Sequence, residues 1–398
     1  MTRQWIYSGY FYLIIITLLG ILLRWKMIAP VWPELQFLHI VHAHSHVAFL
    51  GWVYFILNVV IVRHCFPVHS LTQRSMKIYY YLLHVSVVGM LITFSYQGYG
   101  VYSIAFSTLH AFLSYYFAYR FFSYRSQNWP WFASSFYQAA IWFNLLSSLG
   151  PWGVALNQMI GSGDSNLSNL FVYYYLHLQY NGWFTFVILG VCYSLAYPTA
   201  TKPTSTIRWL FYMVAVSVIP SYLSTSLWFF DHPLAALIGM IGSLLQFLAI
   251  ALFLIHVAKP LWLKQQDGAM RWLLGLSFIS LGVKSLFELI GAWPVLSYAV
   301  FDSRQVIIAY LHLTLLGFIT SFLLYYIVVV YTSQRLAMSS TVYCMGVAGM
   351  IILLFLAGLF EWVKISLTKS IWIGLLGTSL LIGGALLKMF WDIHKSYR

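Results

Sequence analysis

The stretch His312-Leu-Thr-Leu-Leu-Gly-Phe-Ile-Thr-Ser-Phe-Leu-Leu-Tyr-Tyr-Ile-Val-Val-Val-Tyr331 decides the fold class. It contains no Lys, Arg, Asp or Glu, and its length of roughly 20 residues matches an α-helix that crosses about 30 Å of hydrocarbon. Similar apolar runs recur along the chain of 398 residues, of which 61% are hydrophobic and only 7% are charged. So few charges exclude a soluble or disordered protein, and the runs lack the alternation of a membrane β-barrel. We therefore expect an all-α integral membrane protein in a lipid bilayer.

Hydropathy windows predict twelve membrane-spanning helices joined by short loops. Fifteen of the 21 Lys and Arg residues fall on one side of this arrangement and five on the other, with Lys284 inside a span. Because basic residues favour the cytoplasmic side, both termini are predicted to be cytoplasmic. Residues 1–398 then form one transmembrane domain of a multi-pass protein of the cell inner (plasma) membrane. The predicted spans are residues 6–28, 36–62, 77–99, 101–122, 131–156, 170–196, 207–230, 234–258, 270–293, 306–331, 341–363 and 370–391.

One motif occurs in the second, sixth and tenth predicted spans. Its three copies are His46-Val-Ala-Phe-Leu-Gly51-Trp52, His177-Leu-Gln-Tyr-Asn-Gly182-Trp183 and His312-Leu-Thr-Leu-Leu-Gly317-Phe318. The histidines are 131 and 135 residues apart, which is close to one third of the chain. This spacing predicts three pseudo-repeated four-helix units, at about residues 1–130, 131–265 and 266–398. All three spans run inward from the outside, so the imidazoles are expected roughly 10–15 Å below the outer surface.

The second span holds the densest group of candidate ligands, His39-Ile-Val-His42-Ala-His44-Ser-His46. His39, His42 and His46 share one helix face, whereas His44 lies about 200° away from its neighbours. Buried imidazoles need polar partners, and imidazole is the usual ligand of haem iron, copper and zinc. We interpret the segment as a metal or haem site, with either two centres on opposite helix faces or one metal bound at i and i+4. The chain has no HExxH and no CxxCH motif, which favours b-type haem or copper over zinc or covalent haem.

Four further candidates lie outside this segment. Lys284 and Glu288 stand four residues apart in the ninth span, as a local ion pair or as part of a proton or ion path. Asp231-His232-Pro233 is interpreted as a turn before a helix that starts at Pro233, with a metal or cofactor contact by His232 as the alternative. Tyr180 follows His177 by three residues. It is either a packing residue or a source of protons or electrons beside a metal.

The run His42-Ala-His44 with the later Leu50-Gly51-Trp52 resembles the HxH…LGW helix of the haem–copper oxidase superfamily. The closest likeness is to C-type oxidases and nitric oxide reductases, and the overall plan is similar to NnrS-type haem- and copper-containing membrane proteins. That superfamily has twelve helices in a pseudo-threefold arrangement and His ligands on its second, sixth and tenth helices. The resemblance implies that His46 (or His42) and His312 ligate a low-spin haem and that His177 faces a second metal or haem. His44, on the opposite helix face, is the other candidate metal ligand.

Two positions depart from the oxidase pattern. Residues 222–230 contain no His, although the seventh helix of oxidases carries a His–His pair for copper. The tenth span has one His, because Tyr310 stands where a second His of HxH would be. The resemblance therefore implies a derived member that keeps the scaffold and some of the metal sites.

The leading expectation is a haem- or copper-binding membrane protein in nitric oxide or oxygen chemistry, redox reactions or sensing. As an enzyme it would be an oxidoreductase, and an electron-donor protein or subunit would have to supply it. The alternative is a proton-coupled secondary transporter without haem, against which the threefold repeat counts, since transporters usually show twofold repeats. A terminal oxidase or nitric oxide reductase with an unusual metal site is a third hypothesis. The net charge of +13 comes from basic residues in one set of loops and does not indicate a nucleic-acid partner.

Overall fold

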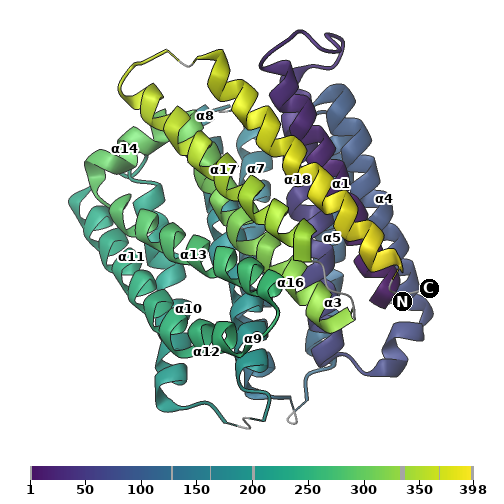
Figure 1. Ribbon diagram of the computed structural model, residues 1–398. Helices are drawn as coiled ribbons and strands as arrows, with labels where there is room; N and C mark the ends of the chain where they lie inside the picture. The colour runs from purple at the N-terminus through teal and green to yellow at the C-terminus, as the bar shows by residue number, and fades with distance from the viewer. Residues whose placement is uncertain are drawn as a thin grey trace. The chain divides into compact units, whose positions relative to one another are not determined.

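The computed structural model describes residues 2–126, 129–161, 163–199, 202–331, 337–366 and 368–395. Over these ranges the chain is helical, with several π-helical segments and one 3-10 segment, and has no strand. Figure 1 shows the helices as long, mostly unbroken rods. The chain divides into two compact units, one of residues 1–127, 323–353 and 367–398 and the other of residues 128–322 and 354–366.

In the first unit, α1 packs against α18 and against the long helix that α2, η1 and α3 form together. Helix α4 packs against both α2 and α5. Its elements are α1 Thr2–Lys26, α2 Phe37–His46, η1 Val47–Val53, α3 Tyr54–Cys65, η2 Val68–Thr72, α4 Arg74–Gln97, α5 Val101–Ser123 and α18 Lys369–Lys395, with parts of α16 Ser321–Tyr331 and α17 Ala337–Trp362.

In the second unit, α10 and α11 form the most extensive helix pair, and α13 packs against both α11 and η6. Its elements are η3 Ala133–Tyr137, α6 Gln138–Ser147, α7 Leu149–Met159, α8 Ser165–His177, η4 Leu178–Phe184, α9 Thr185–Ala196, α10 Ser205–Thr225, α11 Pro233–Phe253, η5 Leu254–Ala258, α12 Lys259–Lys264, α13 Gly268–Ile290, α14 Pro294–Asp302, α15 Arg304–His312 and η6 Leu313–Thr320.

Ten helices of the described chain are long and apolar enough to cross a membrane, so the prediction of an all-α, multi-pass membrane protein is confirmed. The predicted spans at 101–122 and 170–196 are also helical, as α5 and as the continuous helix α8–η4–α9. Both carry several Tyr and Ser side chains and one His, and the second also carries Asn and Gln, which keeps them below the hydropathy of the other ten. Twelve crossings, the side of the termini and the choice of membrane stay predictions.

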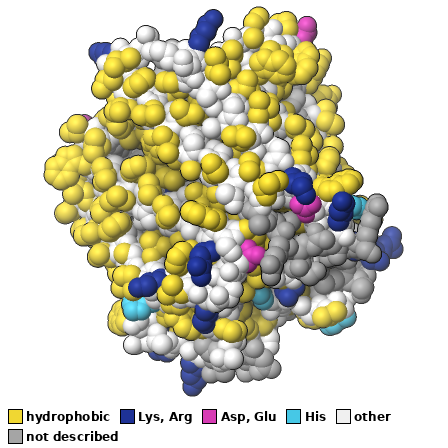
Figure 2. Space-filling view, viewed as in Figure 1, with side chains coloured by type: hydrophobic (Ala, Val, Ile, Leu, Met, Phe, Trp, Pro, Cys, Tyr) yellow, Lys and Arg dark blue, Asp and Glu magenta, His cyan; other side chains and the backbone are white. Residues whose placement is uncertain are grey.

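Large hydrophobic side chains are exposed along the outer faces of single helices. Leu237, Ile241 and Leu248 follow one face of α11, and Ile373 and Leu380 follow one face of α18, all about half exposed. Figure 2 shows hydrophobic side chains over much of the viewed surface. Lipid is the environment that such surfaces require, since water would make them an aggregation hazard.

Small residues bring α10 and α11 into backbone contact. A Cβ atom on Gly242 would lie 2.5 Å from the backbone nitrogen of Ser221, and one on Gly239 would lie 2.7 Å from that of Ser224. Ser224 and Ser243 also share a hydrogen bond of 3.0 Å across this contact. Close approach through small residues is the usual way for membrane helices to gain packing contacts. Here it brings the next turn of α11, with Gln246, up to α10.

The division of the chain into two units neither confirms nor contradicts the predicted threefold repeat. The division near residue 128 lies close to the predicted boundary near 130. The third predicted repeat contributes residues to both units. Three units of four helices therefore remain a prediction.

Candidate functional site

Helix α2 presents its histidines to two different neighbours in the first unit. The rings of His42 and His46 lie 4.6 and 5.7 Å from the ring of Tyr99, just beyond α4. His44 faces the opposite way, where its Nδ1 is 2.9 Å from the carbonyl oxygen of Ile16 on α1. The opposite orientation of His44, which helical geometry predicted, is confirmed.

Each of the three motif histidines directly precedes a π-helical turn. His46 precedes η1, His177 precedes η4 and His312 precedes η6. π-helical residues make up well under 1% of residues in globular proteins, and π-turns are frequent at functional sites. The shared backbone makes the three motifs alike in local structure as well as in sequence.

Side chains of neighbouring helices bond to the backbone of these turns. In the first unit His110 on α5 donates from Nε2 to the carbonyl oxygen of Leu50 in η1, at 3.2 Å. In the second unit Ser277 on α13 donates to the carbonyl oxygen of Phe318 in η6, at 2.9 Å. The turns η1 and η6 are therefore each held in place by their own unit, and His110 is engaged in packing.

His46 and His312 share one ring arrangement. In His46, Nδ1 is 2.9 Å from the carbonyl oxygen of His42, and in His312, Nδ1 is 2.8 Å from that of Ile308. Each acceptor lies four residues earlier on the same helix. A carbonyl oxygen only accepts, so Nδ1 carries the proton and Nε2 of the neutral ring carries the lone pair. Metal-bound histidines are usually oriented by such a bond from the second ring nitrogen.

His39 and His44 make similar Nδ1 contacts, but with carbonyl oxygens of other helices. His39 bonds to Tyr96 O on α4 at 3.2 Å, and His44 bonds to Ile16 O on α1. These two rings therefore tie α2 to its neighbours. The predicted metal role of His44 is not tested by this contact and stays a prediction.

His177 differs from the other two motif histidines because both of its ring nitrogens face hydrogen-bond partners. Nε2 donates to the carbonyl oxygen of Val218 at 2.9 Å, and Nδ1 faces the Asn181 amide nitrogen at 3.3 Å. The side chain is 1% exposed. A metal could bind to His177 only after one of these contacts had been broken, so this conformation suits a structural hydrogen-bonding role.

Lys284 and Glu288 form a buried ion pair on α13, within the second unit. The ammonium nitrogen lies 2.9 Å from each carboxylate oxygen, and the two side chains are 2% and 8% exposed. The predicted pairing of these residues is therefore confirmed, although their role is not tested. Two charges with so little contact with solvent require further hydrogen bonds.

Three uncharged side chains from three other elements supply those hydrogen bonds. Glu288 accepts from Asn181 of η4 at 2.8 Å, from Gln246 of α11 at 2.7 Å and from Tyr310 of α15 at 2.5 Å. Lys284 donates its remaining bond to Asn181 Oδ1 at 2.5 Å. The ion pair therefore joins four elements of the unit.

The network extends through Gln246 and Asn181 to α10 and α8. Ser221 donates to Gln246 Oε1 at 2.9 Å, and Gln246 donates to Asn181 Oδ1 at 3.2 Å. Tyr180, a predicted candidate, lies beside the pair, with its ring centroid 5.3 Å from the Lys284 nitrogen as a cation–π contact. Tyr180 and His177 are thus brought together with the Lys284–Glu288 pair, which was predicted independently of them.

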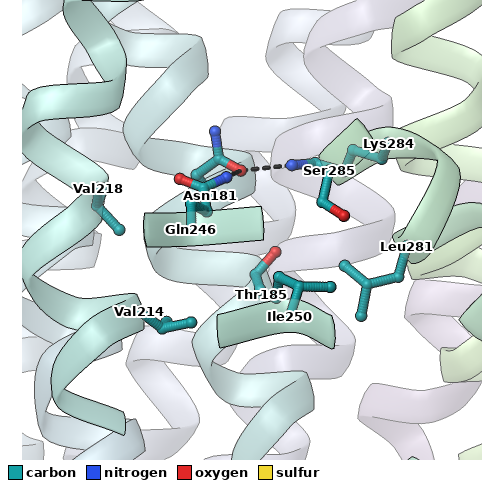
Figure 3. Close-up of a pocket in the computed structure, with 9 residues that line it drawn as sticks. All are labelled: Asn181, Thr185, Val214, Val218, Gln246, Ile250, Leu281, Lys284 and Ser285. Atoms are coloured by element: carbon teal, nitrogen blue, oxygen red, sulfur yellow. Dashed lines mark hydrogen bonds between the residues drawn. The ribbon is translucent and has the colours of Figure 1, made fainter. Parts of the chain in front are cut away.

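A small cavity adjoins this network (Figure 3). Its polar wall is formed by Asn181, Gln246, Thr185, Ser285 and Lys284, and its apolar wall by Val214, Val218, Ile250 and Leu281. Figure 3 shows Lys284 reaching toward Asn181. The free space corresponds to roughly one water molecule.

Helix α11 starts at Pro233, as predicted, and the His232 side chain caps it. The His232 Nδ1 accepts from the backbone nitrogen of Leu234 at 3.1 Å. The neighbouring Asp231 carboxylate is hydrogen-bonded to Tyr298, which raises the pKa of that hydroxyl. His232 is therefore engaged in local structure, and its alternative role as a cofactor contact is not tested.

Asn181 and Gln246 were not among the predicted site residues. Asn181 is the fourth residue after its motif histidine, where the other two motifs have Leu50 and Leu316. Gln246 is the one amide in the otherwise apolar helix α11. A polar residue that departs from an apolar repeat position is the signal that would have identified Asn181.

The described residues contain no group of three or more His, Cys, Asp or Glu side chains that could hold a metal ion. A copper site with three imidazoles, as in oxidases, therefore has no support in this part of the chain. Haem needs fewer protein ligands, since one or two axial side chains suffice. Comparison with protein-family models and with curated proteins finds no match.

Proposed function

We propose that this chain is a haem-binding, multi-pass membrane protein of the haem–copper oxidase-like type, with His46 and His312 as haem ligands. Its role would be redox chemistry or sensing with nitric oxide or oxygen, and copper would be its second cofactor. The shared ring arrangement of His46 and His312 carries the assignment. Each ring is oriented by the carbonyl four residues earlier and presents Nε2 as the basic nitrogen.

The residues around His46 and His312 would orient these two haem ligands and would take no part in the reaction themselves. The carbonyl oxygens of His42 and Ile308 keep the proton on Nδ1 and stop each ring from turning. Bound haem would supply an iron that exchanges electrons and binds diatomic gases. Tyr99, with its hydroxyl 3.5 Å from His46 Nε2, would have to move to admit the iron.

The test is the absorption spectrum of the purified protein, made in cells supplied with haem. We expect a Soret band that is lost or shifted in His46→Ala and in His312→Ala. His177→Ala should keep the band, because both nitrogens of that ring already have partners. His256→Ala, at an exposed histidine of another π-turn, is the matched control for loss of an imidazole. An unchanged band in both His46→Ala and His312→Ala would refute the ligand assignment.

The buried ion pair favours a second candidate, a proton-coupled secondary transporter without haem. Membrane helices rarely keep Lys and Glu in their interior unless the charges serve transport, proton transfer or a cofactor. Colourless, metal-free protein that moves a solute together with protons in vesicles would support this candidate. A Soret band at one haem per chain would exclude it.

A further inference from the structure

In the Lys284–Glu288 network every hydrogen-bond partner of the Glu288 carboxylate is a donor, an arrangement that packing alone does not require. Glu288 accepts hydrogen bonds from Lys284, Asn181, Gln246 and Tyr310, so the carboxylate is surrounded by donors. Replacement of a buried ion pair by apolar residues of similar size is often neutral or stabilising. The pair therefore needs a reason beyond stability, and the cavity beside Lys284 provides one.

The cavity offers a place for water next to the charges. The Thr185 hydroxyl donates to Tyr180 O at 2.5 Å, and the Ser285 hydroxyl donates to Gly282 O at 2.9 Å. Both hydroxyl hydrogens are therefore used, and both hydroxyl oxygens keep lone pairs that can accept from a water molecule. A water in a cavity needs two to four polar partners, and this wall provides them.

We propose that Glu288 is a proton-binding site, that Lys284 is its built-in counter-ion, and that water in the adjoining cavity delivers the proton. Lys284 lines the cavity and lies 2.9 Å from both Glu288 oxygens, so it connects the two. On uptake, an N–H bond of Lys284 breaks as its proton forms an O–H bond on the Glu288 carboxyl group, and a hydronium ion in the cavity returns a proton to the Lys284 nitrogen and remains as one water molecule. Lys284 is therefore an ammonium before and after the step. The site then changes from net neutral to one positive charge, which disfavours the bound proton until it is released back to water.

The other groups around Glu288 leave it as the proton acceptor. The elements packed on it contribute the titratable groups Lys284 of α13, His177 of α8, Tyr180 of η4 and Tyr310 of α15. Helices α10 and α11 contribute only uncharged contacts, through Ser221 and Gln246. His177 already donates from Nε2 and faces the Asn181 amide at Nδ1, so its contacts suit the neutral ring.

Proton binding would also change hydrogen bonding in the network. A protonated Glu288 has one oxygen that donates, whereas Asn181, Gln246 and Tyr310 all donate to it in the observed state. At least one of these donors must then turn away or reverse. The Tyr310 hydroxyl is able to reverse its bond, because a phenol oxygen accepts as well as donates. The amide of Gln246 is held in its orientation, since it also donates to Asn181 Oδ1 at 3.2 Å. The proton is thereby linked to the contact between α13 and α15.

Infrared difference spectroscopy on the full chain in lipid tests the proposal. As pH is lowered, we expect a protonated-carboxyl band that shifts in heavy water and is absent from Glu288→Gln. In Lys284→Met the band should appear at a pH about 1–3 units higher, because the neighbouring positive charge is gone. Thr185→Val, which removes one water partner while keeping the side-chain size, should slow the hydrogen–deuterium exchange of this band several-fold.

Asp392→Asn is the matched control, since Asp392 pairs with Lys388 at the same i,i+4 spacing on the exposed side of α18. This variant should leave the Glu288 band unchanged. The double variant Lys284→Met/Glu288→Gln leaves no unpaired buried charge. It therefore serves as a folded control if a single variant fails to fold. A band that persists in Glu288→Gln, or a Glu288 that stays ionised over the whole pH range in which the protein remains folded, would overturn the proposal.

Discussion

Removal of the Lys284 charge gives the sharpest test of how the second unit is stabilised. In Lys284→Met the side chain keeps its length but loses two contacts of 2.9 Å with Glu288 and one with Asn181. Glu288 is left as a buried carboxylate with only uncharged donors around it. Breaking a buried pair in this way costs about 3–5 kcal/mol of unfolding free energy.

The exposed Lys388–Asp392 pair on α18 serves as a control that separates the effect of burial on stability from the effect of charge. Lys388 and Asp392 have the same spacing, but the Lys388 side chain is 53% exposed. Lys388→Met should therefore cost less than about 1 kcal/mol. Lys284→Met/Glu288→Gln should regain most of the loss, with a coupling energy of about 2–3 kcal/mol in the double-mutant cycle.

Reversible unfolding in mixed micelles, with denaturing detergent as the variable, measures the stability of five proteins under one condition: the wild type, Lys284→Met, Glu288→Gln, the double variant and Lys388→Met. The reasoning is refuted when Lys284→Met loses no more stability than Lys388→Met. It is refuted equally when the double variant is as unstable as the sum of its two single variants, because the charges then act independently.

Three further predictions concern packing and hydrogen bonding, and the same unfolding measurement checks each. Gly242→Ala should lower the free energy of unfolding by about 1–3 kcal/mol, because the new Cβ would lie 2.5 Å from the Ser221 backbone nitrogen. Its control is Gly377→Ala, where a Cβ would meet nothing within 4 Å. This variant should leave the free energy of unfolding unchanged or raise it by up to about 1 kcal/mol. Asn181→Leu, which introduces the residue found in the other two motifs, should cost at least about 1–3 kcal/mol, because it leaves buried polar partners unsatisfied. His232→Ala should cost about 1 kcal/mol through loss of the cap on α11.

The membrane class and the ion pair could be predicted because they depend on composition and on local spacing. A chain with 7% charged residues has no soluble alternative, and residues four apart on a helix are neighbours wherever that helix lies. The orientation of His44 away from His42 and His46 followed from the same local geometry. None of these results needed knowledge of which helices pack together.

The partners of the ion pair could not be predicted, because they depend on how each helix is rotated and on which helices are neighbours. Asn181, Gln246 and Tyr310 come from three elements that are far apart in the sequence. The π-turns were missed as well, because a π-turn changes the hydrogen-bonding register without leaving a periodic pattern. The polar helices at 101–123 and 165–196 show the limit of hydropathy, since their helical structure was predictable but their crossing of the membrane is not decided by it.

The position of both charges on one helix has a consequence for biogenesis. Helix α13 enters the bilayer before its contacts with later segments such as Tyr310 exist. A lone Lys within a membrane helix opposes insertion, by up to roughly 2.5–3.5 kcal/mol when it stands at the helix centre, and Lys284 and Glu288 stand in the last third of α13. Because Glu288 is one turn from Lys284, the ammonium and carboxylate can neutralise each other as soon as that turn forms. The translocation machinery thus receives a segment in which these two charges cancel, and the amide and phenol partners can assemble around them afterwards.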